Sequence, residues 1–205
     1  MPALSAILAT MIDLYTFRKT IEDCIENNTG AIFKNFIPED IVPKWEDLLG
    51  CIYDETKESI AFKPGAHEKS YGNVLLADNL YIVSHLTKMQ SNKYFSKLNK
   101  YCDDLGQTTG VGMECIGPKI SLGPQKVDAF HIDSWHAFGL QCEGKAKWTL
   151  SDTQDGTGKY IEELYPTRGD LVFFPKGMWH KVETDDNIRG GIQFSSTGIF
   201  KEMSN

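Results

Sequence analysis

The feature that most constrains the fold of this chain is a change of pattern near residue 110. From Gly110 onward, short runs rich in β-branched and aromatic residues alternate with glycine, proline, aspartate and asparagine. Many short strands separated by turn residues are typical of a β-sandwich or barrel. Glu143-Gly144-Lys145 is interpreted as a tight hairpin turn. The predicted strands cover residues 111–116, 129–133, 138–142, 146–150, 171–174 and 188–194.

The first half of the chain differs, because much of its apolar spacing is helical. Helices are predicted over 12–27, ending at Asn28-Thr29-Gly30, and over 81–105. A strand is predicted over 31–37, and residues 57–80 are interpreted as strands and loops. A further helix is predicted to open at Pro38, with one apolar face formed by Val42, Trp45, Leu48, Leu49 and Ile52.

At 205 residues, one domain is expected. We predict a mainly β fold with flanking helices, a single domain over 1–205. In it, residues 1–110 form a part of helical and mixed structure that packs against the β core. Residues 111–200 form that β core, which carries the functional site.

Composition narrows the function classes. The chain has 28 Asp and Glu against 21 Lys and Arg, a net charge of −7, which argues against a broad nucleic-acid footprint. Its five cysteines are an odd number without a C-x-x-C motif, which argues against a disulfide framework or a zinc cluster. Free thiols in a reducing cytoplasm are expected. No apolar run approaches a membrane span, so a membrane partner is not expected.

Three residues carry the strongest chemical signal: the H-x-D pair His131 and Asp133, and His180. Alternate side chains of a strand share a face, so a strand over 129–133 would project His131 and Asp133 together. A hairpin after the strand 171–174 would bring His180 back toward them. Two imidazoles and one carboxylate form the facial triad of non-haem iron(II) sites, which leaves coordination positions open.

The spacing of Gly169, Pro175, Gly177 and His180 resembles the second sequence motif of the cupin superfamily. The first motif has a matching spacing, because Gly144 lies 11 residues after Asp133, where cupins place a hairpin glycine. Within that superfamily, residues 169–182 resemble the segment that carries the distal histidine of JmjC-type oxygenases. The H-x-D pair followed by Gly144 and Trp148 resembles their first half. The resemblance covers about residues 111–195.

The resemblance implies a double-stranded β-helix (jelly-roll) fold, iron(II) held by His131, Asp133 and His180, 2-oxoglutarate as co-substrate, and dioxygen. The implied reaction is hydroxylation of an unactivated C–H bond, with release of succinate and carbon dioxide. The sequence leaves the substrate open between a small molecule and a protein or peptide side chain. It also leaves the oligomeric state open.

A carboxylate bound inside a barrel needs a cation, ideally a bidentate one. Arg189 is the leading candidate, because it lies nine residues after His180, about where several 2-oxoglutarate oxygenases place an anchoring arginine. JmjC-type proteins often use a lysine in G-x-K-x-W instead, and here Ala146 occupies that position. Lys147 is a second candidate, which a β-bulge would turn inward.

Several local interpretations stay open. Cupins with four metal ligands carry a glutamate soon after the first ligand pair, whereas this chain has no carboxylate there. His136 is a possible additional ligand, but a structural or substrate-facing role is favoured for it. Three tryptophans are expected either to line a pocket or to belong to the core: Trp135, Trp148 and Trp179. The core is favoured for Trp148. The segment 151–167 is a lid or an ordinary connection.

Two other functions fit the same residues. A cupin metalloenzyme that uses iron without a ketoacid would keep the triad but would not need Arg189. A non-catalytic cupin that binds a ligand or partner would need neither the triad nor the anchor.

Overall fold

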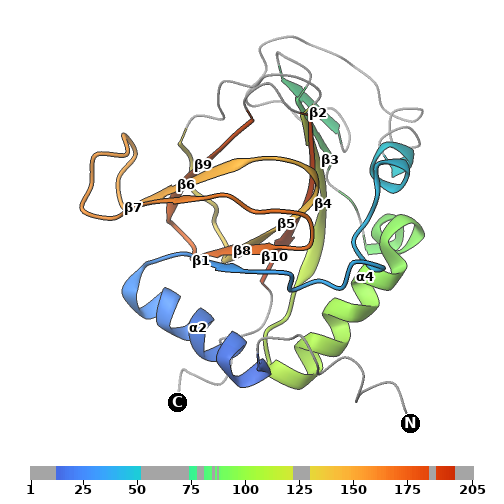
Figure 1. The fold of residues 1–205 in the computed structure, drawn as a ribbon, viewed down its shortest axis with the longest axis horizontal. Helices are drawn as coiled ribbons and strands as arrows, with labels where there is room; N and C mark the ends of the chain where they lie inside the picture. The colour runs from blue at the N-terminus through green and yellow to red at the C-terminus, as the bar shows by residue number, and fades with distance from the viewer. Residues whose placement is uncertain are drawn as a thin grey trace.

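Two antiparallel sheets form the body of the protein in a computed structural model (Figure 1). The structure describes residues 13–51, 74–77, 81–84, 86, 88–121, 130–184 and 188–196. Within these residues, seven strands form the larger sheet in the order β1-β8-β5-β10-β4-β3-β2, and three form the smaller sheet in the order β7-β6-β9. The mainly β fold predicted from the sequence is therefore confirmed.

The elements follow one another along the chain as helices first and strands later. Two helices, α2 (Leu14–Asn27) and α4 (Lys88–Thr109), lie on one side of the larger sheet, and residues 45–51 are also helical (Figure 1). The strands are β1 (Ala31–Phe33), β2 (Val74–Ala77), β3 (Tyr81–Ser84), β4 (Glu114–Ser121), β5 (Ala137–Gly144), β6 (Lys147–Ser151), β7 (Ile161–Leu164), β8 (Leu171–Phe174), β9 (Trp179–Glu183) and β10 (Arg189–Ser195).

The start and end of α2 follow from its capping residues. Asp13 caps the N-terminus, because its carboxylate accepts a hydrogen bond from the main-chain N–H of Tyr15. Asn28 closes the C-terminus in the left-handed conformation, with φ 51° and ψ 51°. The predicted helix end at Asn28 is therefore confirmed.

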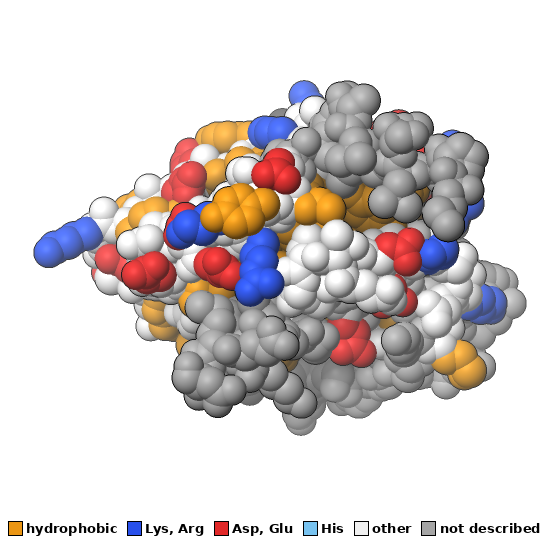
Figure 2. All heavy atoms as spheres, turned by 90° about the horizontal axis from the view of Figure 1, so that it is seen from below, with side chains coloured by type: hydrophobic (Ala, Val, Ile, Leu, Met, Phe, Trp, Pro, Cys, Tyr) orange, Lys and Arg blue, Asp and Glu red, His pale blue; other side chains and the backbone are white. Residues whose placement is uncertain are grey.

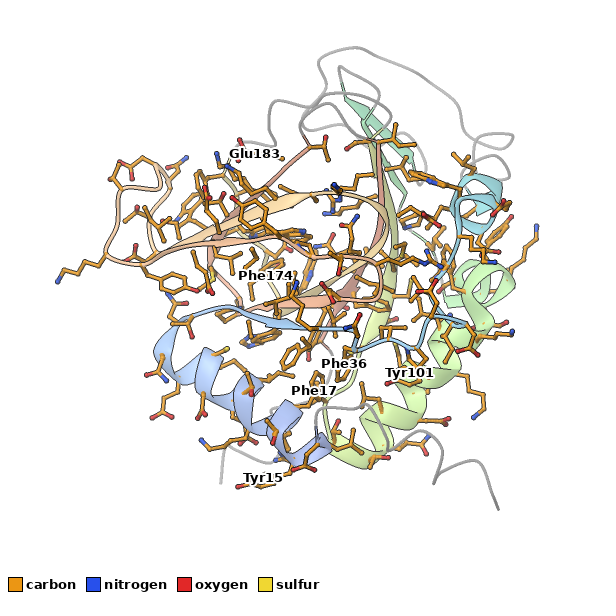
Figure 3. All side chains as sticks on the ribbon, viewed as in Figure 1. Tyr15, Phe17, Phe36, Tyr101, Phe174 and Glu183 are labelled. Atoms are coloured by element: carbon orange, nitrogen blue, oxygen red, sulfur yellow. The ribbon has the colours of Figure 1, made fainter. Side chains whose placement is uncertain are left out.

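Buried side chains form two apolar clusters, one on each face of the larger sheet. The outer cluster joins the sheet to the helices, and its Phe17 and Phe36 rings stack with centroids 4.4 Å apart. The inner cluster fills the space between the two sheets and includes Trp148, Leu150 and Phe174. Figure 3 shows Phe17 and Phe36 next to α2, and Phe174 higher, between the strands. The interior that the sheets enclose is thus separate from the helix-covered core.

The N-terminal half supplies strands as well as helices. β1 pairs with β8, and β2 pairs with β3, so both edge strands of the larger sheet come from residues before 110. The predicted helix over 81–105 is wrong at its start, because Tyr81–Ser84 is strand β3. The predicted strand 31–37 is shorter than expected, since β1 ends at Phe33. Within the helical stretch 45–51, Leu48 is buried but Leu49 is 43% exposed, so Leu49 does not share the predicted apolar face.

The two connections predicted as hairpins instead cross between the sheets. β5 pairs with β8 and β10 in the larger sheet, whereas the next strand, β6, pairs with β7 and β9 in the smaller one. In the same way β8 and β9 belong to different sheets. Strand alternation alone cannot separate a hairpin from a crossover, because both need the same turn residues. The sequence also missed β7, which lies within the segment interpreted as one long loop.

Gly144 is required at the corner between β5 and β6. Its φ is +70°, and a Cβ atom there would overlap the carbonyl oxygen of Ile188. A side chain would therefore separate β5 from the start of β10. Residues 52–73 lie outside the described part of the chain, so the interpretation of 57–80 is tested only at β2 and not before it.

Charged side chains of both signs are mixed on the face seen in Figure 2. Ion pairs at i,i+4 occur on both helices, as in Arg18–Glu22 and Lys100–Asp104. Among the coloured residues of Figure 2, the basic side chains do not form a single patch of the kind that nucleic acids require. Among the described residues, no helix is long and apolar enough to span a membrane.

Asp170 ties β1 to the turn before β8. Its side chain is fully buried, and its carboxylate accepts hydrogen bonds from the main-chain N–H groups of Asn35 and Thr167, the Thr167 hydroxyl and the Lys34 ammonium. Although burial opposes the charge, these donors lower the pKa of Asp170 below its ordinary value. Asp170 is therefore a structural anion at the edge where the N-terminal strand joins the sheet.

Replacing Asp170 tests that role. We expect Asp170→Ala to lower the free energy of unfolding by about 2–3 kcal/mol, because donors around a buried acceptor lose their partner. Urea unfolding measures this loss. Asp155→Ala is the matched control, since Asp155 also accepts several hydrogen bonds but lies exposed on a loop, so its loss should be clearly smaller. Equal losses in both variants would contradict the structural role of Asp170.

Candidate metal centre

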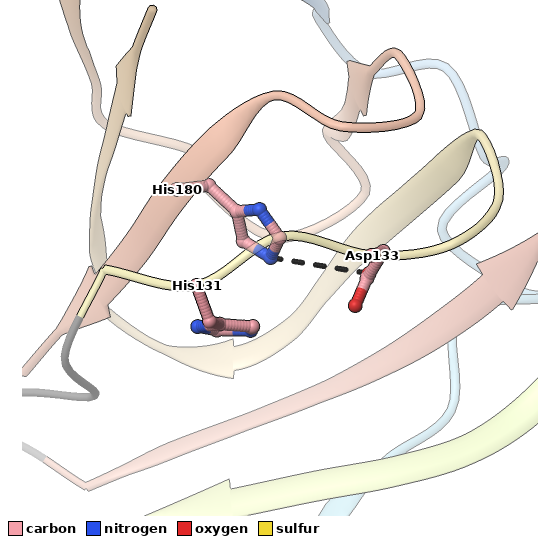
Figure 4. Close-up of side chains that lie close together, drawn as sticks. All are labelled: His131, Asp133 and His180. Carbon is pink, nitrogen blue, oxygen red and sulfur yellow. Dashed lines mark ion pairs between the residues drawn. The ribbon is translucent and has the colours of Figure 1, made fainter. Parts of the chain in front are cut away.

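His131, Asp133 and His180 come together at one end of the space between the sheets (Figure 4). One potential ligand atom from each lies within 4.8 Å of the other two, and the Asp133 Oδ2 to His180 Nε2 distance is 3.9 Å. His180 is buried, and the other two are partly buried. Small side-chain rotations bring three such atoms to the usual metal–ligand distance of about 2 Å from one ion.

The main chains of His131 and His180 hold each other in place. Each donates its N–H to the other's carbonyl oxygen, at 3.0 and 2.9 Å, which forms an isolated antiparallel bridge. Their rings lie 4.2 Å apart between centroids. The strand predicted over 129–133 is wrong, because beyond this bridge residues 132–136 are irregular. Asp133 thus reaches the site from a loop, and not through strand alternation.

The orientation of the His180 ring suits a metal ligand. Its Nδ1 lies 3.1 Å from the carbonyl oxygen of Met178, and as the donor to that oxygen it leaves the Nε2 lone pair facing Asp133. Burial, and then the neighbouring His131, lower the pKa of His180 to about 3. The ring is therefore neutral at physiological pH, which is the form that binds a metal.

Gln193 reaches Asp133 from β10. Its side-chain amide donates a 2.8 Å hydrogen bond to Asp133 Oδ2. The main-chain carbonyl of Asp133 accepts a second bond, at 3.1 Å, from the N–H of Gly177. The glycine in the second motif thus holds the loop that carries the carboxylate. The sequence offered no signal for the Gln193 contact, because it joins residues that are 60 positions apart.

The three ligand side chains suit a divalent transition metal that keeps some of its coordination positions open. Two neutral imidazoles and one carboxylate form the facial triad, which binds iron(II) in many oxygenases. The described residues provide no carboxylate as a fourth ligand, since the triad is the one His/Cys/Asp/Glu group that the described part of the chain brings within ligating distance. The arrangement therefore leaves room on the ion for small ligands.

Arg189 faces the interior on the same side of β10 as Gln193. The two lie four positions apart on a paired strand, so their side chains share a face. Arg189 is 4% exposed, and its guanidinium carbon lies 5.4 Å from the centre of the Trp148 ring on the opposite sheet. Gly191 lies between them, and a Cβ atom there would come within 3.5 Å of the Arg189 guanidinium. A side chain at this position would therefore crowd the cation and the neighbouring strand.

Lys119 is a second cation on this inner face, and the sequence did not single it out. It pairs with Gly191 from β4, while the adjacent pair Ile120 and Gly190 faces the helix-covered core. Its positive charge contributes to the lowered pKa of His180, which places it within electrostatic range of the triad.

Lys147 lies on the other side of the smaller sheet. Its ammonium forms ion pairs with Glu163 at 3.2 Å and with Glu183 at 3.1 Å. These carboxylates raise the pKa of Lys147 above its usual range. Figure 3 shows Glu183 on the far side of the strands from the helices. The bulge that would have turned Lys147 inward is not present, because β6 pairs with both neighbours without a register shift.

Of the other candidates, His136 and Trp148 have structural positions. His136 Nδ1 accepts a 3.1 Å hydrogen bond from the main-chain N–H of Lys176, so the ring fixes the turn before His180. Trp148 is buried in the inner cluster, as expected for a core residue. Trp135 is 37% exposed and Trp179 is partly buried. The connection over 151–167, interpreted as a lid or an ordinary connection, is shorter than expected, because β7 occupies 161–164.

Comparison with known proteins agrees with this geometry. Residues 114–204 match the family model of the JmjC domain. A prolyl hydroxylase from Trichoplax adhaerens, solved with a hypoxia-inducible-factor peptide, superposes with a TM-score of 0.56 at 10% identity over 94% of each chain. The Escherichia coli ribosomal oxygenase YcfD, solved with cobalt and 2-oxoglutarate, gives 0.55 at 16% identity over 86% of this chain and 52% of its own. The chain therefore has a double-stranded β-helix fold like that of these oxygenases.

Curated relatives are similar over part of the chain. The Drosophila sechellia bifunctional lysine-specific demethylase and histidyl-hydroxylase NO66 is 26% identical over 117 residues, which is 48% of this chain and 17% of that protein. Human ribosomal oxygenase 1 is 28% identical over 90 residues, or 35% and 14%. The matched region thus spans less than a fifth of these relatives. The family resemblance drawn from the two sequence motifs is confirmed by these matches.

The two partly exposed histidines of this region should behave differently on substitution. We expect His136→Ala to lower the free energy of unfolding by about 1 kcal/mol, the value of one lost hydrogen bond, and to leave Mn(II) affinity unchanged. His131→Ala should lower Mn(II) affinity by at least about 100-fold. Calorimetric Mn(II) titration and urea unfolding measure both quantities. Loss of Mn(II) binding in His136→Ala would show that His136, too, belongs to the site.

Proposed function

We propose that this protein is an iron(II)- and 2-oxoglutarate-dependent oxygenase that hydroxylates an unactivated C–H bond. The observation that carries the proposal is the triad of His131, Asp133 and His180 at the end of an interior that also holds the buried cation Arg189. The solved structures of similar fold support it, because one of them binds cobalt and 2-oxoglutarate. Iron(II), 2-oxoglutarate and dioxygen are accordingly the proposed cofactor and co-substrates.

In this proposal each residue has a definite task. His131, Asp133 and His180 hold the iron, which when bound supplies oxidative decarboxylation of 2-oxoglutarate coupled to C–H hydroxylation. The Met178 carbonyl keeps the lone pair of His180 directed at the ion. The inner cluster, with Phe174 in contact with the His180 ring at 4.1 Å between centroids, excludes water from that side.

Arg189 is the proposed anchor for the distal carboxylate of 2-oxoglutarate. It lies on the strand that also reaches Asp133, with Gly191 between the two positions. A guanidinium can bind a carboxylate through two parallel hydrogen bonds, and burial strengthens that attraction. The ion pairs of Lys147 on the outer face remove it as an alternative in this proposal.

A protein or peptide side chain is the proposed substrate class, ahead of a small molecule. One structural neighbour was solved with a peptide, and others are named ribosomal oxygenases. The proposed location is the cytoplasm, which the five cysteines support, because all five are described and none of them forms a disulfide.

Turnover of 2-oxoglutarate tests the proposal directly. We expect the iron-loaded protein to form succinate slowly without its main substrate, and His180→Ala to reduce that rate by at least about 100-fold, because a ligand is lost. Succinate is measured by NMR, with His136→Ala as the matched histidine control. Normal turnover of 2-oxoglutarate in His180→Ala would contradict the proposal.

The anchor is tested by binding without turnover. With Mn(II) in the site, Arg189→Met should weaken 2-oxoglutarate binding by about 100-fold, in line with the 2–5 kcal/mol cost of removing one partner of a buried charge pair. Metal affinity should not change. Lys147→Met is the matched control and should bind 2-oxoglutarate normally, because its ammonium lies outside the interior. Full 2-oxoglutarate affinity in Arg189→Met would refute the anchor and favour a metalloenzyme that needs no ketoacid.

A further inference from the structure

Gln193 makes the one side-chain hydrogen bond to the Asp133 carboxylate that the described structure records. The donor is the amide Nε2, the acceptor is Oδ2, and the distance is 2.8 Å. Oδ2 is also the carboxylate oxygen that faces His180 Nε2. The contact therefore acts on the atom that points into the candidate metal site.

The three members of the triad are held in different ways. His131 and His180 are fixed by their reciprocal main-chain bonds, and the His180 ring is fixed again by Met178. Asp133 lies in an irregular segment, and its main chain is held through its carbonyl oxygen by Gly177. That bond does not set the rotation of the carboxylate. Gln193 supplies the missing restraint.

The sheet gives Gln193 a rigid base and room for its side chain. Its main chain is paired on both sides within β10, with Gly117 of β4 and Gly139 of β5 as the facing residues. Neither neighbour has a side chain that competes for the space, and Gln193 is only 6% exposed. A Cβ atom at Gly139 would come within 2.5 Å of the Trp148 ring, so the small residue is required there. The amide is thus directed at Asp133 by the strand itself.

We propose that Gln193 is a positioning residue that sets the Asp133 carboxylate in its metal-binding orientation before a metal arrives. The inference rests on the metal site of the proposed function. A neutral amide suits this task, because it stabilises the carboxylate anion without adding a charge or a competing ligand. Oδ2 keeps a further lone pair for the ion while it accepts from Gln193. Since Arg189 projects from the same strand face, β10 fixes the Asp133 ligand and the proposed co-substrate anchor relative to each other.

The test measures Mn(II) affinity and the absorption spectrum of the Co(II)-loaded protein, with no 2-oxoglutarate and no turnover. Gln193→Met keeps the side-chain length but has no donor. Gln193→Asn keeps the amide but is one methylene too short to hold the contact. We expect each variant to bind Mn(II) about 10–100-fold more weakly, as for other residues that orient metal ligands, and to shift the Co(II) spectrum.

Gln141→Met is the matched control. Gln141 is an equally buried glutamine on β5, and its amide donates to the carbonyl oxygen of Glu143 at 2.7 Å, not to a triad residue. Its Mn(II) affinity and Co(II) spectrum should equal those of the wild type. Thermal unfolding of the apo-proteins verifies that all variants are folded.

Each outcome decides the inference. Weak binding in both Gln193 variants with normal binding in Gln141→Met supports it. The inference is overturned if either folded Gln193 variant binds Mn(II) with wild-type affinity, or if all three variants lose Mn(II) affinity equally. Neither of these results would contradict the metal site itself. Absence of Mn(II) binding in the wild-type protein would overturn the metal site, and thereby the proposed function as well.

Discussion

The pair of main-chain hydrogen bonds between His131 and His180 is the contact on which the candidate site depends. These bonds attach the irregular segment around His131 to the first residues of β9. Two imidazole rings from distant parts of the sequence therefore lie side by side. Asp133 and the Gly177 turn then follow, because the carbonyl of Asp133 accepts from Gly177 only when the two segments lie side by side. Buried main-chain groups need partners, and here satisfying them assembles the site.

The larger sheet contributes a different property, which is rigidity. β10 lies in the middle of that sheet and is paired along its length with β4 and β5. Side chains that project inward from such a strand keep their spacing, and Gln193 and Arg189 are two of them. Glycines on the inner surface let other side chains pack closely, since the Trp148 ring lies over Gly139 and the Arg189 guanidinium lies beside Gly191. The same strand therefore places both side chains precisely, which is what a binding site requires.

The sequence predicted which residues gather in the candidate site better than it predicted the path of the chain. Residue types and intervals indicated the three triad residues and the inward position of Arg189. They also indicated the cupin spacing of Gly169, Pro175, Gly177 and His180. The predicted strand under His131 and Asp133 is wrong, because the same alternation of residue types can also occur in a loop. The two supposed hairpins at Gly144 and at residues 175–178 are crossovers, since turn residues do not specify which sheet the next strand joins.

What the sequence by itself determined is local: the end of α2 at Asn28, the strand over 171–174, and a set of ligand types at metal-binding intervals. Only the tertiary structure decided which of these residues meet. It placed Lys147 among outer carboxylates and Lys119 on the inner face, and it joined Gln193 to Asp133 across 60 positions. The physical reason is that periodicity and capping act over a few residues. Contacts between strands depend on sheet order and register, which the burial of the whole chain selects.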